Sequence, residues 1–181
     1  MIQPAPPAKA SGEGVDPGAA PLASDDDVRP PWHWVGFGTI VTFACWLPLA
    51  YLAEAVRHRI FVSRFGESPS REDVELAFAA MNGLERFRWT AMQTLPHLVA
   101  FAVSAFAGGL LVGRFGSGTG PREGAASGLV TALVALAVSW RVLAEGGWGA
   151  VVSVVVPLVI AFSFAWWGGR VGTRKRAKKA A

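Results

Sequence analysis

Long stretches without a charged residue alternate with short charged segments along this chain of 181 residues. Four such stretches cover residues 30–53, 89–113, 124–140 and 146–169 and contain 24, 25, 17 and 24 residues. A helix of 24 residues is roughly 36 Å long at about 1.5 Å of rise per residue, enough to cross a hydrocarbon core of about 30 Å. The pattern therefore predicts an all-α integral membrane protein with four transmembrane helices in two hairpins.

The predicted transmembrane domain covers residues 32–171, with helices at about 32–56, 89–113, 124–144 and 148–171. The third uncharged stretch is the shortest, so we expect Arg141 to extend toward the headgroups and complete that span. Indole rings concentrate at the two membrane interfaces. Seven of the eight tryptophans lie at predicted helix ends, Trp89 among them, and only Trp46 falls in the middle of a span.

Two polar segments lie outside these helices, one before the first helix and one after it. Residues 1–31 hold seven prolines and an acidic run, and we predict a disordered tail because such a segment cannot bury enough apolar surface. Residues 57–88 are the predicted extramembrane connection, in which Ser70 caps a short amphipathic helix that ends near Gly83. This helix is expected to pack on the protein's own membrane-facing rim, with partner binding as the alternative, through Val74, Ala77, Phe78, Met81 and Leu84.

The distribution of basic residues predicts that both termini are cytoplasmic. Ten of the 17 Lys and Arg residues lie on the side of the termini and seven on the other side, and basic residues concentrate in cytoplasmic segments. Residues 172–181 form a basic tail, which we interpret as a contact for anionic lipid. Nucleic acid is the less favoured partner because no nucleic-acid-binding module is present. The lipid contact would be made by Arg170, Arg174, Lys175, Arg176, Lys178 and Lys179.

Small residues recur at a spacing of four in the second, third and fourth predicted helices, which places them on one helix face. Lipid tails are as apolar as leucine, so helices in a bilayer associate through close packing, which faces of small residues permit. We therefore predict helix contacts within the bundle, and association with a second copy or another membrane protein. The predicted packing residues are Ala105, Gly108, Gly109, Gly113, Gly124, Gly128, Ala161, Ala165, Gly169 and Gly172.

The segment from Gly108 to Arg114, Gly-Gly-x-x-x-Gly-Arg, is followed by a helix that carries Gly124 and Gly128. In these features, residues 89–176 resemble small bacterial four-helix glycine-zipper membrane proteins of unknown function. The resemblance implies a helical bundle and brings no activity with it. The abundance of Ala, Gly, Arg and Trp is typical of a GC-rich bacterium, so the predicted location is the bacterial cytoplasmic (inner) membrane.

Ionisable residues within membrane spans are candidates for function, and His97, next to Pro96, is the one well inside a predicted span. It is a candidate for transport or proton relay, although we favour a hydrogen bond to a carbonyl freed by Pro96. His33, His58 and Cys45 are too scattered for a metal site, and no phosphate-binding loop is present. The sequence thus predicts a structural or assembly protein without catalysis or cofactor; the alternative is a channel or transporter subunit with a path near His97.

Overall fold

The computed structural model describes residues 31–116, 120–139 and 147–180. The predicted disordered tail at residues 1–31 therefore lies almost wholly outside the described residues, as do Arg141 and most of the turn expected at residues 145–147. The described helices are α1 (Pro31–Phe65), α2 (Arg71–Ala80), α3 (Gly83–Phe115), α4 (Pro121–Val138) and α6 (Gly147–Ala180). Within these ranges no strand is present, which confirms the all-helical prediction.

Three helices, α1, α3 and α6, are long and apolar enough to cross a membrane. They contain 35, 33 and 34 residues, so each is about 50 Å long and exceeds a hydrocarbon core of about 30 Å. The third predicted span, at residues 124–144, is not of this kind within its described residues. α4 has 18 residues, and Arg122 and Glu123 occupy its first turn.

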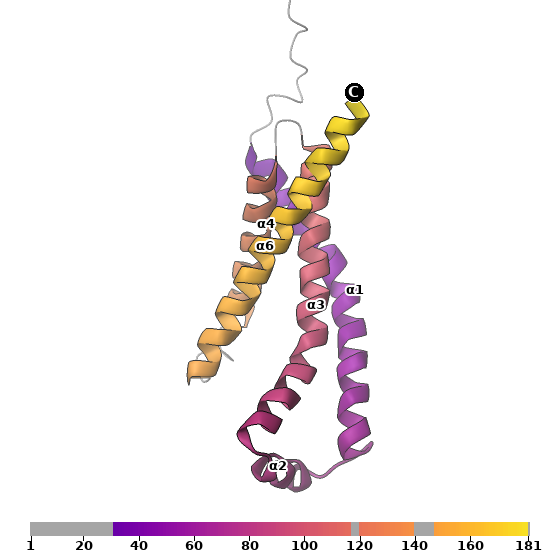
Figure 1. The fold of residues 1–181 in the computed structure, drawn as a ribbon, viewed down its shortest axis with the longest axis vertical. Helices are drawn as coiled ribbons and strands as arrows, with labels where there is room; N and C mark the ends of the chain where they lie inside the picture. The colour runs from indigo at the N-terminus through magenta and orange to yellow at the C-terminus, as the bar shows by residue number, and fades with distance from the viewer. Residues whose placement is uncertain (1–30, 117–119, 140–146, 181) are drawn as a thin grey trace, which may run out of the picture.

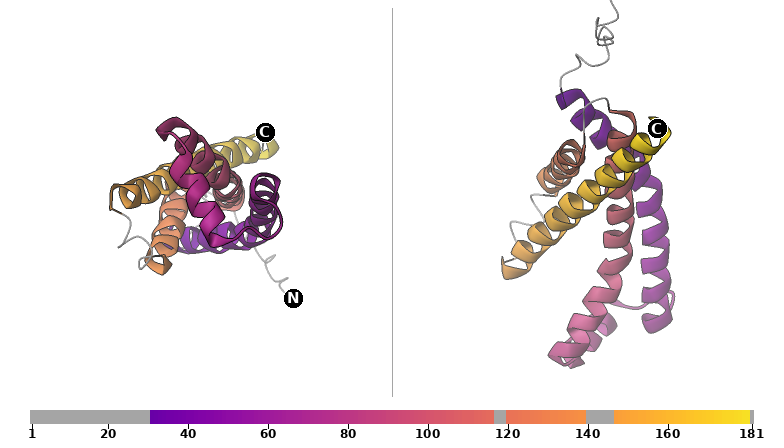
Figure 2. Two further views of the ribbon diagram at one scale, coloured as in Figure 1. Left: turned by 90° about the horizontal axis from the view of Figure 1, so that it is seen from below. Right: turned by 45° about the horizontal axis from the view of Figure 1, so that its top comes forward.

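Four helices form a bundle in the order α1, α3, α6, α4, with a further contact across the ring between α3 and α4. Figure 1 shows α1 and α3 side by side and continuing past the lower ends of α4 and α6, where α2 joins them. We call this the α2 end of the molecule. At the opposite, terminal end, α1 and α4 begin and α3 and α6 finish (Figures 1 and 2).

The helices extend beyond the predicted spans because their stop signals lie further along the chain. α1 continues to Phe65 and ends at Gly66, whose φ of 84° is the left-handed conformation that glycine adopts readily after a helix. The predicted tail at residues 172–181 is helical through Ala180. Both extensions lack an internal glycine pair or proline that would break them.

The helix predicted after Ser70 is present as α2. The Ser70 hydroxyl accepts a hydrogen bond from the Asp73 amide at 3.0 Å, and the Asp73 carboxylate accepts one from the Ser70 amide at 3.3 Å. α2 ends at Ala80 rather than near Gly83 because Asn82 starts the next helix with an equivalent capping box to Glu85. Two reciprocal caps therefore set the sharp turns at this end of the molecule.

Candidate functional site

The closest helix contact joins α3 to α6 at positions without side chains. A Cβ atom built on Gly109 would overlap the carbonyl oxygen of Ala165, and one built on Gly113 would overlap the carbonyl oxygen of Gly169. The contact is reciprocal, because a Cβ atom on Gly172 would meet the carbonyl oxygen of Leu110. The two backbones therefore touch over about two turns.

α4 enters the same contact with the glycines of its own first half. A Cβ atom on Gly124 would lie 2.9 Å from the Ala165 carbonyl oxygen, and one on Gly128 would lie 2.5 Å from that of Ala161. All ten predicted packing residues are buried: Ala105, Gly108, Gly109, Gly113, Gly124, Gly128, Ala161, Ala165, Gly169 and Gly172. The terminal half of the bundle is thus filled by helix backbone and small side chains.

The two adjacent glycines of α3 face different helices. Gly108 lies against α1, where a Cβ atom would overlap the Thr42 hydroxyl and come within 2.8 Å of the Gly38 carbonyl oxygen. This contact was not predicted from the sequence, although Gly38 and Thr42 have the spacing of four that places small residues on one face. The Thr42 hydroxyl donates to the Gly38 carbonyl at 2.8 Å, so it is satisfied within its own helix.

The other hydroxyls buried in this half of the bundle are also hydrogen-bonded within their own helices. The hydroxyls of Ser104, Ser127 and Thr131 donate to carbonyl oxygens one turn earlier, at 2.7, 2.7 and 2.8 Å. A hydroxyl that is satisfied within its own helix can be buried in a bilayer at little cost, because its polar atoms need no water. These serine and threonine residues can therefore pack between helices in the same way as small apolar residues.

His97 is held by a carboxylate on the neighbouring helix. Its Nε2 atom lies 3.4 Å from Oε2 of Glu54 on α1, and Arg57 donates to the same carboxylate at 2.8 and 2.5 Å. From the sequence, His97 was expected to bond to a backbone carbonyl freed by Pro96. Instead, the structure brings His97 and Glu54 together in a charged group that links α1 to α3.

Gln93, on α3, is a further polar residue with a buried amide, which the pattern of ionisable residues in the sequence does not reveal. It lies one turn before His97, and its amide nitrogen and oxygen are buried without a hydrogen-bond partner among the described residues. Buried amides are almost always hydrogen-bonded. α3 therefore carries an unsatisfied buried amide one turn before His97, whereas the hydroxyls buried in the terminal half are satisfied within their own helices.

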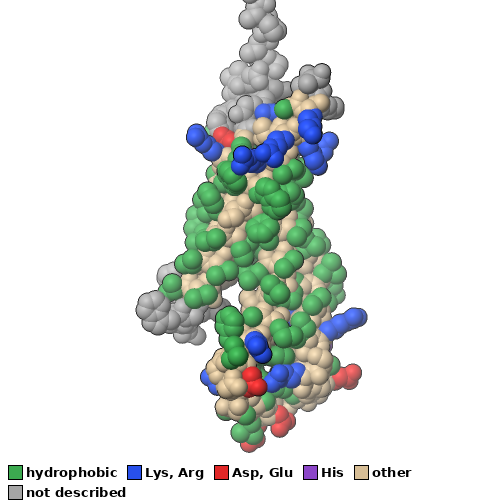
Figure 3. Space-filling view, in the orientation of Figure 1, with side chains coloured by type: hydrophobic (Ala, Val, Ile, Leu, Met, Phe, Trp, Pro, Cys, Tyr) green, Lys and Arg blue, Asp and Glu red, His purple; other side chains and the backbone are tan. Residues whose placement is uncertain are grey.

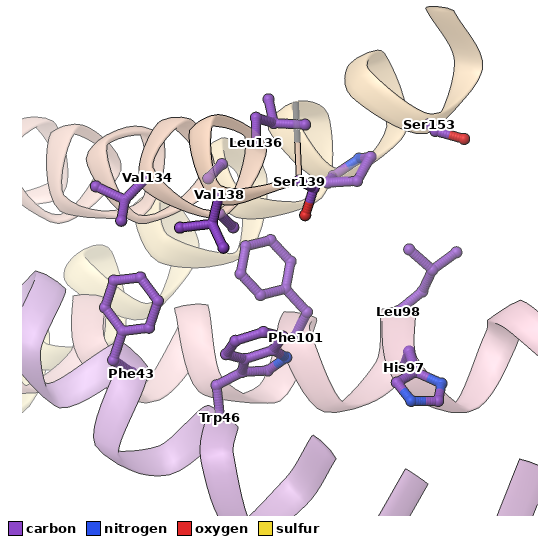
Figure 4. Close-up of a pocket in the computed structure, with 13 residues that line it drawn as sticks. Phe43, Trp46, His97, Leu98, Phe101, Val134, Leu136, Val138, Ser139 and Ser153 are labelled. Carbon is purple, nitrogen blue, oxygen red and sulfur yellow. The ribbon is translucent and has the colours of Figure 1, made fainter. Parts of the chain in front are cut away.

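A cavity of about 390 Å³ opens beside His97 between the four helices. Phe43 and Trp46 of α1 and Phe101 of α3 form an aromatic wall, which faces the end of α4 in Figure 4. His97 and Ser139 lie at one end of this cavity. The Trp46 and Phe101 rings pack edge to face at 6.2 Å. We call this space the interhelical cavity.

Trp89 is enclosed by neighbouring side chains near the α2 end of the molecule. It is buried, with 6% of its surface exposed, and packs edge to face on Phe65 at 5.4 Å. The Arg64 guanidinium lies 5.1 Å from the centre of its ring. The level of Trp89 at a membrane interface stays a prediction, and the structure adds that side chains of α1 enclose its ring.

Basic side chains gather at the terminal end (Figure 3). Arg170, Arg174, Lys175 and Lys178 are exposed, and Arg170 also lies over the Trp166 ring. Arg176 is half-buried and donates to the Gly116 carbonyl oxygen just beyond the end of α3. Five predicted lipid-contact residues therefore have described side chains, and Arg176 ties α6 to α3 instead of facing outward.

No family model matches the chain, and neither a curated protein nor a solved structure was found to be similar to it. The resemblance to four-helix glycine-zipper families stays a prediction from the motif at residues 108–114.

Proposed function

We propose that this protein is a four-span protein of the bacterial cytoplasmic membrane with a structural or assembly role and both termini in the cytoplasm. The observation that carries the proposal is the contact of α3, α4 and α6 through backbone at Gly109, Gly113, Gly124 and Gly128. Such contacts stabilise helices in lipid, where no hydrophobic effect drives them together. These backbone contacts also leave no room between α3, α4 and α6 for a path that would carry ions or solutes.

The chain direction supports α4 as a fourth membrane span in addition to α1, α3 and α6. α3 finishes at the terminal end and α6 also finishes there after starting toward the α2 end (Figure 1). If α3 and α6 both cross the membrane in the same direction, α4 has to return the chain between them. Its 18 residues give about 27 Å of helix, and the described surface of its second half includes Leu133, Val134 and Val138.

The surface chemistry supports the orientation. Exposed hydrophobic side chains cover the middle of the face shown in Figure 3, and basic side chains cluster above them at the terminal end. Anionic lipids of the cytoplasmic leaflet attract such clusters, at about 1 kcal/mol per basic residue near the surface. Four exposed basic residues of α6 would therefore favour that leaflet: Arg170, Arg174, Lys175 and Lys178.

The assembly role is tested on the tagged full chain in native membranes. After mild chemical cross-linking, we expect one discrete complex that contains either a second copy or one other membrane protein at a fixed ratio. The same chain in liposomes should leave ion and small-solute gradients unchanged. A chain that stays monomeric in the membrane and dissipates a gradient would overturn the proposal.

A channel or transporter subunit is the second candidate, and the interhelical cavity beside His97 favours it. In that case the path has to continue between chains, because the glycine contacts fill the terminal half of one bundle. A His97→Ala variant should then change the rate at which a gradient decays in liposomes. An unchanged rate in that variant would exclude a path that uses His97.

A further inference from the structure

The interhelical cavity has apolar walls and one polar end. Phe43, Trp46 and Phe101 line its side, while His97 and Ser139 line the end that lies level with the finish of α4. Its volume of about 390 Å³ falls in the range of about 300–1,000 Å³ that is typical of small-molecule sites. The cavity is therefore large enough to hold a ligand and has two chemically different ends.

The apolar part of the cavity favours a hydrocarbon over water. A buried water molecule needs two to four polar partners, and the aromatic wall offers it none apart from the indole N–H. An empty space would forfeit the dispersion contacts of the surrounding rings. In the membrane placement proposed above, acyl chains are present around the bundle at high concentration, so a chain can fill this space.

The polar end suits a headgroup. The polar residues that line this end are His97 and Ser139. His97 Nε2 also lies 3.4 Å from Oε2 of Glu54, which is not one of the lining residues. An imidazole and a hydroxyl can donate to a carboxylate or phosphate and accept from a hydroxyl. α4 ends at Val138. A bound acyl chain would leave the apolar part of the cavity at about this level.

We propose that the interhelical cavity binds a single-chain amphiphile, with its acyl chain against Trp46 and Phe101 and its headgroup at His97 and Ser139. The inference rests on the proposed membrane placement. The shared chemistry is one long acyl chain with an anionic head, which either a free fatty acid or a lysophospholipid supplies. A volume of about 390 Å³ lies at the small end of the range for small-molecule sites, so one acyl chain is proposed rather than two.

The test uses the full chain in lipid nanodiscs of phosphatidylglycerol and phosphatidylethanolamine. A photoreactive fatty acid, and in a parallel arm a lysophospholipid with the same chain, are cross-linked by light and mapped by mass spectrometry. We expect labelling at Phe43, Trp46 or Phe101 that unlabelled amphiphile saturates, together with unsaturable labelling on the exposed face at Val159. The arm that labels the cavity identifies the headgroup.

A pair of matched variants localises the site. Ala135 lines the cavity and Ala137, on the same helix, is exposed. Ala135→Phe places a ring in the cavity, and loss of the burial of about two methylenes lowers affinity about tenfold or more, so cavity labelling should fall by at least that factor. Ala137→Phe should leave it unchanged.

Two results would overturn the inference. One is cavity labelling in the wild type that unlabelled amphiphile does not compete away, a measurement that needs no variant to fold. The other is equal labelling of the Ala135→Phe and wild-type cavities. If neither the cavity nor Val159 is labelled, the result counts against the membrane placement. Failure of the membrane placement can thus be distinguished from failure of the cavity to bind an amphiphile.

Discussion

Gly109 and Gly36 lie in long helices of the same bundle but in opposite surroundings. A Cβ atom on Gly109 would overlap the backbone of α6, whereas one on Gly36 would meet nothing within 4 Å. Glycine weakens a helix by about 1 kcal/mol relative to alanine. At Gly109 the loss is offset by a contact that no other residue allows, and at Gly36 no such contact exists.

We therefore predict opposite effects of the same substitution at these two positions. Gly109→Ala should destabilise the bundle by at least about 1–3 kcal/mol, the usual cost of overpacking, because the α6 backbone has to move. Gly36→Ala should be neutral or stabilise by up to about 1 kcal/mol. Thermal unfolding in one detergent measures both, and equal stability of the two variants would contradict the packing.

Among the elements, α2 was predicted well because its signals are local. Ser70 and Asp73 form a capping box within four residues, and such a motif can be recognised without tertiary information. The ends of α1 and α6 were not predicted correctly. An uncharged stretch shows which residues can lie in lipid, but it does not show where the helix ends. α1 continues through Arg57, His58 and Arg59, which are compatible with a helix outside lipid.

Ser70→Ala removes the cap of α2 and should destabilise that helix by about 1 kcal/mol. α2 is short and none of its residues is fully buried, so packing compensates little for the loss. Hydrogen exchange of amides in Arg71–Ala80 should accelerate about fivefold to tenfold at that free energy. Ser68→Ala, an exposed serine outside any helix, is the control, and equal exchange in both variants would argue against the cap.

The α2 end forms a second packed unit around Trp89. Removing the ring by Trp89→Ala should cost about 3–5 kcal/mol there, as for other buried aromatic residues. Hydrogen exchange should then rise in α2 and in the adjoining ends of α1 and α3, while the glycine contact between α3 and α6 stays protected. Trp32→Ala serves as the control because Trp32 is 65% exposed. A uniform rise along the whole chain would show that the molecule has one cooperative unit.

Over the whole molecule, the sequence predicted the faces that pack but not which helices pair. The spacing of small residues marks one side of a helix, and it is the same whether the partner is α1, α4 or α6. Gly108 and Gly109 are neighbours in the chain, yet the first faces α1 and the second faces α6. The contact of His97 with Glu54 depends on the alignment of α1 against α3, which no local pattern encodes.

In the proposed membrane placement the two ends of the molecule lie on opposite sides of the membrane, a prediction that a cysteine at each end can test. Cys45 is the single cysteine of the chain, so Cys45→Ala gives a background without thiols. In this background Glu67→Cys lies at the α2 end and Lys178→Cys at the terminal end, both at exposed positions. A membrane-impermeant maleimide added to spheroplasts should label the first variant alone, because the basic terminal end favours the cytoplasm. After lysis both should react equally.

Labelling of the second variant alone would reverse the orientation. Equal labelling of both variants before lysis would show that α1, α3, α4 and α6 do not place these ends on opposite sides.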